Sequence, residues 1–489
     1  MATGSSFLAS LRTGVRAALV LGAATALVSC GGGSGNGGGP PQVRAINLVY
    51  GGSTAYDVTI AGASAGTDLS FGQATSLTTV ATGAVSVVFE PTGTTTAAST
   101  TTLTASDDYD YTVLGLAGAS STTSTSTSAG LSPIVVSQNN AAPPSGEVNV
   151  VLVQADPNQG ALDVFISGPS STLPSSPTVS ALTYNGSGST PNSAQLQFAG
   201  GDYEIRATAA GDTTRKIVFD SGTVTLAAGT SVMLIVVPTS GSAATFALLA
   251  APLSGSVYSI ADQRVQLRSG NFTPSTGSVD FFLDPTGTAN SSTTLLASAQ
   301  AFGSLGQYAT VYPGSYHASI ATTGALTEIV GADLALAAGT SVSLYATGVQ
   351  GDVSPYLLRL LAVTDDLTAP PTGQAKLRAV QLAPDLVTGT GNGYDLVALT
   401  STGTIAQRIA VNLTYPAASA YVTLPPGTYA LAVVATGADA PLLPNSTGVS
   451  LSLSAGDVYT AVVYGCQSPG AGVCAGGTTA VSIVTQQDP

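Results

Sequence analysis

The chain has 489 residues, which is too long for one hydrophobic core and predicts three or four domains. Hydrophobic residues make up 44% of it, charged residues only 8%, and the formal net charge is −14. This composition excludes a disordered chain, a nucleic-acid-binding surface and electrostatic binding to anionic lipids. It is typical of β-sheets whose solvent faces carry Thr and Ser instead of Lys and Glu.

The first 29 residues have the pattern of a bacterial export signal. Arg12 and Arg16 form a basic region, and residues 17–27 are an apolar run too short to span a bilayer. The segment that follows, Leu27-Val28-Ser29-Cys30-Gly31, resembles the lipobox of bacterial lipoproteins. This resemblance implies cleavage before Cys30 and lipidation of its thiol, whereas the alternative is an ordinary signal peptide.

Residues 30–42 then predict a lipidated Cys followed by a flexible Gly/Pro tether. More than one acyl chain is enough for stable anchoring, so we expect a membrane partner through the lipid. Gly31 stands where an Asp would favour retention in the inner membrane of enteric bacteria. The expected location is therefore the cell envelope, with the outer membrane favoured.

The rest of the chain repeats one pattern four times. The first repeat opens with a predicted half-buried strand, in which Arg44, Ile46 and Leu48 share one face and Ala45 and Asn47 the other. The last repeat matches it with Arg378, Val380 and Leu382, and the third gives a shorter echo that begins at Arg264. The second opens with a more continuously apolar strand, residues 148–153.

A second strand in each repeat carries an aspartate between apolar residues, at Asp57, Asp163, Asp280 and Asp395. The intervals of 106, 117 and 115 residues match the length of one sandwich domain. We expect these aspartates to cap a turn or to satisfy backbone donors at a strand end. Later in the repeat, a Gly-x-Tyr corner precedes another strand at residues 201–203, 314–316 and 427–429.

About seven short strands per repeat, without room for crossover helices, predict an all-β fold of tandem immunoglobulin-like antiparallel β-sandwiches. The predicted boundaries of the four sandwiches are residues 43–142, 146–253, 258–366 and 375–489.

The order of these strand motifs resembles the bacterial domain-of-unknown-function family numbered 4397. The likeness is best in the last repeat, which runs from Leu377-Arg378-Ala379-Val380 through Tyr394-Asp395-Leu396 to Gly427-Thr428-Tyr429. It implies exported, often tandem β-sandwiches without an established activity.

Cys466 and Cys474 flank a Pro/Gly-rich loop, which in an exported protein predicts a disulfide. Closing so short a loop contributes roughly 2–3 kcal/mol. A metal site would need further ligands, and the only His of the chain is His317, in another repeat. We therefore predict no metal and no cofactor, although Asp107, Asp108 and Asp110, or Asp365 and Asp366, are an alternative Ca²⁺ cluster.

These features predict an envelope lipoprotein that presents its sandwiches as a structural spacer or as a protein-interaction and adhesion surface. One alternative is a carbohydrate or cell-wall-polymer binding module, for which the chain has eighteen Tyr but no Trp. The other is a hydrolase with a Gly-x-Ser-x-Gly motif at residues 62–66. That motif needs a strand-turn-helix setting and a nearby base, so we expect a hairpin turn there and no enzyme.

Overall fold

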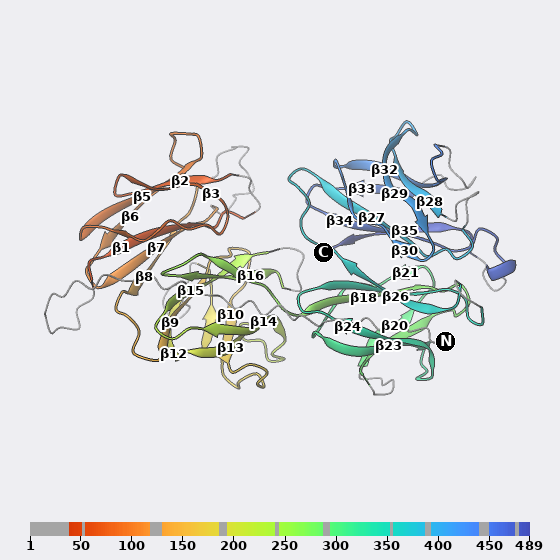
Figure 1. The fold of residues 1–489 in the computed structure, drawn as a ribbon, viewed down its shortest axis with the longest axis horizontal. Helices are drawn as coiled ribbons and strands as arrows, with labels where there is room; N and C mark the ends of the chain where they lie inside the picture. Colours follow the sequence, from red (N-terminus) through yellow and green to blue (C-terminus); the bar gives the residue numbers. More distant parts are fainter. Residues whose placement is uncertain are drawn as a thin grey trace, which may run out of the picture. The chain divides into compact units, whose positions relative to one another are not determined.

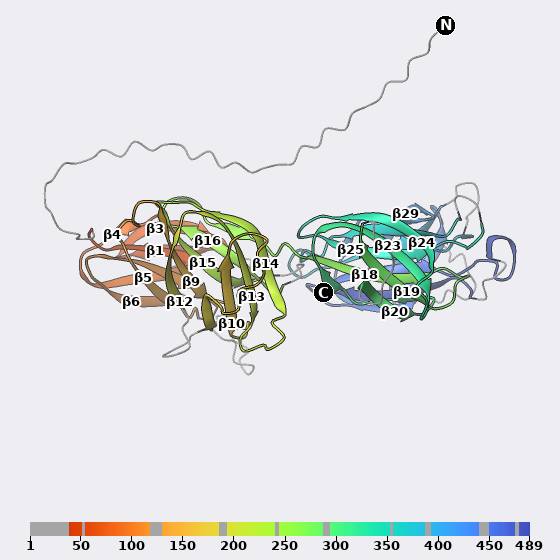
Figure 2. The same ribbon diagram turned by 90° about the horizontal axis from the view of Figure 1, so that it is seen from below.

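The chain folds as β-sandwiches, as expected from the sequence (Figures 1 and 2). Eight sheets form in the described residues and pair into four sandwiches. The computed structural model describes residues 39–50, 54–117, 130–184, 193–239, 244–286, 294–352, 356–386, 393–439, 449–474 and 479–489.

The strands of the first sandwich are β1 (Gln42–Asn47), β2 (Tyr56–Ile60), β3 (Ala63–Leu69), β4 (Thr78–Thr79), β5 (Gly83–Pro91), β6 (Ser99–Ala105), β7 (Tyr109–Gly115) and β8 (Ile134–Asn139). Those of the second are β9 (Glu147–Gln154), β10 (Leu162–Ser167), β11 (Val179–Leu182), β12 (Ser193–Ala199), β13 (Gly201–Ala209), β14 (Ile217–Leu226), β15 (Ser231–Pro238), β16 (Phe246–Pro252) and β17 (Tyr258–Ile260).

The strands of the third sandwich are β18 (Val265–Phe272), β19 (Val279–Pro285), β20 (Leu295–Gln300), β21 (Ser304–Leu305), β22 (Ala309–Val311), β23 (Gly314–Thr322), β24 (Glu328–Leu336), β25 (Ser341–Thr347) and β26 (Arg359–Asp365). Those of the fourth are β27 (Ala375–Gln381), β28 (Gly393–Leu399), β29 (Ile405–Thr414), β30 (Ala417–Ala418), β31 (Val422–Leu424), β32 (Gly427–Ala435), β33 (Val449–Leu453), β34 (Val458–Tyr464) and β35 (Ser482–Asp488).

Each sandwich has two kinds of sheet. The first-strand sheet contains the strand that opens the sandwich, and its strand orders are β4-β1-β7-β8, β12-β9-β15-β16-β17, β21-β18-β25-β26 and β30-β27-β34-β35. The aspartate sheet contains the repeated aspartate, and its orders are β3-β2-β5-β6, β11-β10-β13-β14, β20-β19-β23-β24 and β29-β28-β32-β33. The apolar faces of the two sheets enclose one core per sandwich.

Two details differ from the sequence expectation. One strand pair in each sandwich is parallel, because the opening strand runs alongside a later strand of its own sheet (β1 with β7, β9 with β15, β18 with β25, β27 with β34). In addition, β17 pairs with β16 and so belongs to the second sandwich, although the predicted third sandwich begins at residue 258.

The expectation of half-buried opening strands is wrong. On β1, Val43 and Ala45 face the core of the first sandwich, whereas Ile46 and Leu48 are equally buried in a cluster shared with the second sandwich. In Figure 1, β1, β7 and β8 accordingly lie beside β15 and β16. On β27, Leu377 points into its own core, and Val380 into a cluster shared with the third sandwich. Both faces are buried because a neighbouring sandwich covers the outer one.

The predicted Gly-x-Tyr corners begin β13, β23 and β32, where each Tyr bonds back to the preceding turn. The hydroxyls of Tyr203, Tyr316 and Tyr429 donate to the carbonyl four residues upstream at 2.7, 2.9 and 3.0 Å. This is the geometry of the tyrosine corner of immunoglobulin-like sandwiches, and it holds the entry to the strand. The first sandwich has Val85 at this place.

The substitution Tyr429→Phe tests the corner, because it deletes one hydrogen bond while keeping the ring. We expect a loss of about 0.5–1 kcal/mol in the free energy of unfolding, measured by urea denaturation of the whole chain. Tyr109→Phe, at a Tyr that is 41% exposed, is the control and should change little. An equal effect of both variants would show that the corner hydrogen bond has no special role.

Candidate functional site

The four repeated aspartates share one structural setting. Each lies on the second strand of its sandwich, where the register shifts against the edge strand β3, β11, β20 or β29. The edge-strand residue opposite each one has a left-handed backbone, with φ between 49° and 55° (Asp68, Ala181, Ala299 and Asn412). A register shift of this kind is a β-bulge, which bends an edge strand away from further pairing.

Each aspartate holds its bulge by accepting hydrogen bonds. The Oδ1 atoms of Asp57, Asp163, Asp280 and Asp395 accept the N–H of that left-handed residue at 2.6–2.8 Å. In the last three sandwiches Oδ2 accepts a second N–H from a glycine turn, at Gly211, Gly324 or Gly437. In the first sandwich Thr92 Oγ1 donates to Asp57 instead. The four carboxylates therefore belong to four separate turns and do not form one site.

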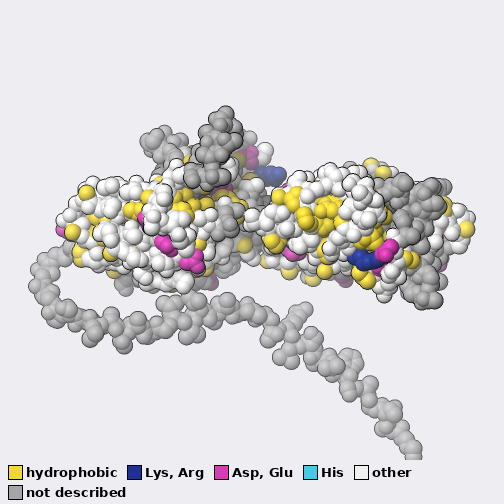
Figure 3. Space-filling model, turned by 90° about the horizontal axis from the view of Figure 1, so that it is seen from above, with side chains coloured by type: hydrophobic (Ala, Val, Ile, Leu, Met, Phe, Trp, Pro, Cys, Tyr) yellow, Lys and Arg dark blue, Asp and Glu magenta, His cyan; other side chains and the backbone are white. Residues whose placement is uncertain are grey.

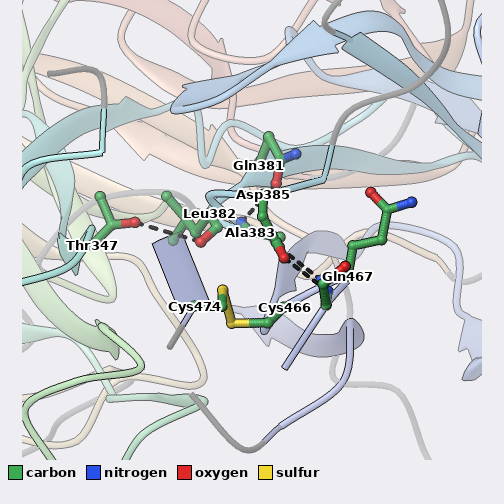
Figure 4. The surroundings of a disulfide bond; sticks show 9 residues. Thr347, Gln381, Leu382, Ala383, Asp385, Cys466, Gln467 and Cys474 are labelled. Carbon is green, nitrogen blue, oxygen red and sulfur yellow. Dashed lines mark hydrogen bonds between the residues drawn. A yellow bond between two sulfur atoms is a disulfide. The ribbon is translucent and has the colours of Figure 1, made fainter. Parts of the chain in front are cut away.

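Cys466 and Cys474, which follow β34 in the chain, form a disulfide (Figure 4). The carboxylate of Asp385 accepts the N–H groups of Gln467 and Ser468 at 2.7 and 2.8 Å, which ties this loop to the segment after β27. Asp385 and the two sulfurs lie within 4.8 Å of one another. Thiolates are the metal-binding form of cysteine, so the disulfide leaves this group without sulfur ligands.

The predicted lipidation site, Cys30, lies outside the described residues. Among the residues that the structure does describe, no helix is long and apolar enough to cross a membrane.

The residues proposed for hydrolase or Ca²⁺ chemistry have other neighbours. Ser64 lies in β3, directly after the hairpin turn at residues 61–62, and the following segment is strand and not helix. His317, on β23, contacts the carboxylates of Asp333 and Glu328 at 2.9 and 3.0 Å, and these raise its pKa. Asp365 pairs with Arg378 and Asp366 with Lys376.

The most developed polar cluster lies between the first-strand sheets of the third and fourth sandwiches, which we call the second interface. Arg268 on β18 points out of the third sandwich toward the fourth. Arg378 on β27 points out of the fourth sandwich toward the third. The Nε of each donates to the hydroxyl directly across its parallel strand pair, Ser343 at 2.7 Å and Thr460 at 3.3 Å.

Each arginine of the second interface then reaches a carboxylate of the opposite sandwich. Arg268 Nη1 pairs with Asp488 Oδ1 at 2.5 Å, and Arg378 Nη2 pairs with Asp365 Oδ1. Both aspartates end the last strand of their sandwich. The third and fourth sandwiches are thus related by an approximate twofold pattern, in which equivalent strand positions of each sandwich bind the other sandwich.

Hydroxyl groups complete the network. Ser343 and Thr460 donate to the second oxygens of Asp365 and Asp488, each at 2.7 Å. Tyr308 donates to Asp365 at 2.5 Å, and the Arg268 guanidinium lies 4.5 Å from the centre of its ring.

The charges of the second interface are buried and balanced. Side chains of the four ionic residues are 0–1% exposed. Burial raises the pKa of Asp488, against the opposing effects of Arg268 and Thr460. Burying ions is costly unless each one is paired and hydrogen-bonded, and two arginines matched with two carboxylates meet that condition.

We call the contact between the first and second sandwiches the first interface. It has an arginine at the equivalent strand position, but this arginine binds backbone carbonyls instead of a carboxylate. Arg44 Nε donates to Thr112 across the β1–β7 pair at 3.1 Å. Its Nη atoms then donate to the carbonyls of Pro252 and Ala251, at 2.5 and 3.0 Å. Burial lowers the pKa of Arg44 to about 10. Around it lies an apolar cluster drawn from both sandwiches, which includes Ile46, Leu114, Val151 and Ile235.

A smaller junction joins the second and third sandwiches. Arg264, just before β18, pairs with Asp262 at 2.7 Å and donates to the carbonyls of Ile217 and Val218 on β14. Asp262 also accepts the N–H of Asp220 at 3.1 Å. Burial, together with the charge of Glu204, raises the pKa of Asp220 to about 6.

The prediction for the third repeat therefore named the wrong arginine. Arg268, and not Arg264, takes the place of Arg44 and Arg378, because it lies across from Ser343 as they lie across from Thr112 and Thr460. The shift of four residues keeps the same strand face, so alternation could not reveal it. Asp488 was missed as well, although its position at the end of the last strand matches that of Asp365.

Comparisons with solved structures give distant similarities. The TIE protein of Bacillus anthracis is 10% identical, with 85% of this chain and 69% of that chain covered and a TM-score of 0.15. A leucine-rich repeat protein of Bacteroides thetaiotaomicron is 14% identical, with 40% and 25% covered and a TM-score of 0.13. A putative cell adhesion protein of Bacteroides fragilis is 10% identical, with 47% and 98% covered and a TM-score of 0.11. Scores this low carry no argument about function.

No curated protein matches the chain. The family described as Domain of unknown function (DUF4397) matches residues 41–165 and 265–388, which together are just over half of the sequence. Each match begins at the opening of an odd-numbered sandwich and continues past the opening strand of its partner, β9 or β27. The chain therefore belongs to the DUF4397 family.

Proposed function

We propose that this protein is a cell-envelope lipoprotein, anchored through lipid on Cys30, whose paired sandwiches act as a stiff spacer that presents an interaction surface. The role is structural and binding, without catalysis. The observation that carries the proposal is the reciprocal ion network of the second interface. A buried network that crosses between two domains couples their orientation, whereas domains joined by a linker alone would move independently.

The two interfaces support stiffness in different ways. At the first, Ile46, Leu114 and Ile235 are buried in a shared apolar cluster, so separating the sandwiches would expose them to water. Burying such a side chain is worth roughly 1.5–3 kcal/mol. At the second interface, Phe272, Tyr345 and Val380 are likewise buried in a shared apolar cluster. The ion network in addition favours one relative orientation of the two sandwiches.

The surface fits a protein that stands in the envelope without electrostatic attachment. On the face drawn in Figure 3, charged side chains are sparse among the described residues, and hydrophobic side chains gather in patches. This surface therefore does not favour a membrane contact through basic residues, and the lipid would be the membrane anchor. The glycine-rich segment at residues 31–39 separates the predicted anchor from the first strand.

The anchor is tested by metabolic labelling with radioactive palmitate. We expect label in the wild type and none in Cys30→Ala, which should also leave the membrane fraction, because its thiol is the predicted acylation point. Cys466→Ala is the matched control and should keep the label. Label that persists in Cys30→Ala would contradict the anchor, and density-gradient separation of the membranes would test the outer-membrane assignment.

The coupling of the third and fourth sandwiches is tested with Asp365→Ala. This change leaves Arg378 buried without its carboxylate, and removing one partner of a buried pair costs about 3–5 kcal/mol. We expect a lower urea midpoint and faster proteolysis in the connection at residues 366–374. Asp366→Ala, next to it, removes a half-exposed partner of Lys376 and should cost about 1 kcal/mol or less.

Asp365→Leu combined with Arg378→Met should recover much of the stability lost in Asp365→Ala, because no charge is then left unpaired. If Asp365→Ala and Asp366→Ala were equally mild, the network would not couple the two sandwiches.

The junction at Asp220 predicts a pH dependence. Its pKa of about 6 lies above the ordinary value of 3.8, so the folded chain binds more protons than the unfolded chain between these values. The stability that Asp220 contributes is therefore present below pH 4 and lost as the pH rises through 6. Relative to Asp220→Asn, the wild type should lose stability between pH 4 and 6, measured by calorimetry. Parallel curves for wild type and Asp220→Asn would contradict the prediction.

A further inference from the structure

A pocket of about 350 Å³ opens where the first interface reaches the surface. The first sandwich contributes Tyr50 and the loop at residues 71–73, and the second contributes the ends of β15 and β17 with part of β16. Its floor is the apolar cluster of the first interface, because Val237 and Leu249 belong to both. The volume lies at the lower end of the range for small-molecule sites, roughly 300–1,000 Å³.

In the second interface, the position equivalent to this pocket is filled by protein side chains. Gly72 donates to the carbonyl of Asn47 at 2.7 Å, and Gly303 donates to that of Asn271 at 2.8 Å, so Phe71-Gly72 and Phe302-Gly303 occupy equivalent positions. On the opposite sandwich, Val236 pairs with Gln154 as Val463 pairs with Gln381. The residues that follow, Val237 and Tyr464, are therefore equivalent too.

Tyr464 closes the second interface where Val237 leaves the first one open. The ring of Tyr464 packs edge-on against Phe302, with centroids 5.5 Å apart. It also covers Gly303 so closely that a Cβ there would lie 2.5 Å from the ring. At Gly72 the nearest atom to such a Cβ is Leu249 Cδ1, at 3.7 Å. The pocket thus exists because a small side chain stands at residue 237.

The lining combines aromatic rings with neutral polar groups. Tyr258 and Tyr50 are 47% and 41% exposed, and Tyr50 stands edge-on to Phe71 with centroids 5.4 Å apart. The hydroxyls of Thr239 and Ser259 and the amide of Gln73 complete the polar part. None of the lining residues is charged, in a chain whose net charge is −14.

We propose that this pocket binds a neutral sugar residue of a polysaccharide. A pyranose ring has an apolar C–H face that packs on an aromatic ring, and hydroxyls at its edge that bond to amide and hydroxyl groups. An anionic polymer would find no cation in the lining and would be repelled by the acidic chain. A lipid would leave the hydroxyls of Thr239 and Ser259 facing an apolar ligand without partners from it. Binding needs only the first two sandwiches and is independent of the lipid anchor.

The test measures binding of the full chain to malto-, cello- and chito-oligosaccharides by glycan array and calorimetry, with hyaluronate and a proline-rich peptide as comparison ligands. We expect at least one neutral oligosaccharide to bind and the two comparison ligands not to bind. Val237→Tyr copies the residue that fills the second interface and should abolish binding. Tyr258→Ala removes an exposed ring and should weaken binding by about tenfold.

Two controls separate loss of binding from loss of folding. Tyr312→Ala, at a Tyr that is 50% exposed in the third sandwich, should leave affinity unchanged. The melting temperature of each variant is measured, and Tyr258→Ala, at an exposed position, decides the outcome if Val237→Tyr does not fold. The proposal is overturned if no neutral oligosaccharide binds, if Tyr258→Ala and a folded Val237→Tyr bind as the wild type does, or if only the proline-rich peptide binds and Tyr258→Ala weakens it.

Discussion

The structure depends on sheets that are buried on both faces. In a sandwich that stands alone, one face of each sheet is exposed to water, and residues with hydroxyl side chains can occupy that face. The first-strand sheets of this chain instead place Ile46 and Leu48, or Val380 and Leu382, on the outer face, where a neighbouring sandwich covers them. The consequence is that the sandwiches associate in pairs, first with second and third with fourth, and each pair shares a buried layer in addition to its two cores.

The two shared layers meet this constraint by different means. In the second interface the apolar side chains supply most of the stabilisation, because a buried ion pair roughly balances the cost of dehydrating its charges. The reciprocal bonds of Arg268 and Arg378 restrict the relative orientation of the two sandwiches, since each guanidinium has to meet one carboxylate and two hydroxyls. In the first interface Arg44 bonds to carbonyl groups and the apolar cluster carries the contact. One small residue, Val237, leaves that layer incompletely filled at its edge.

This difference connects packing with the functions that we propose. A spacer needs its domains to keep their orientation, and two-sided burial provides a physical basis for that. The same layers end at the surface, where one is closed by Tyr464 and the other opens into an aromatic pocket. A binding site placed between two sandwiches has walls from both, so ligand affinity and the stiffness of the pair would depend on the same contacts.

The sequence by itself determined the features that depend on neighbouring residues. Alternation and turn residues predicted the all-β sandwiches, the spacing of Asp57, Asp163, Asp280 and Asp395 predicted their repetition, and the short loop between Cys466 and Cys474 predicted their disulfide. Only the tertiary structure decided what covers the outer faces. Alternation assigned Arg44, Ile46 and Leu48 to one face but did not show that a second sandwich lies on it, because that contact joins residues about a hundred positions apart or more. For the same reason Arg264 was indistinguishable from Arg268, and the equivalence of Val237 and Tyr464 became visible only once the strands were paired.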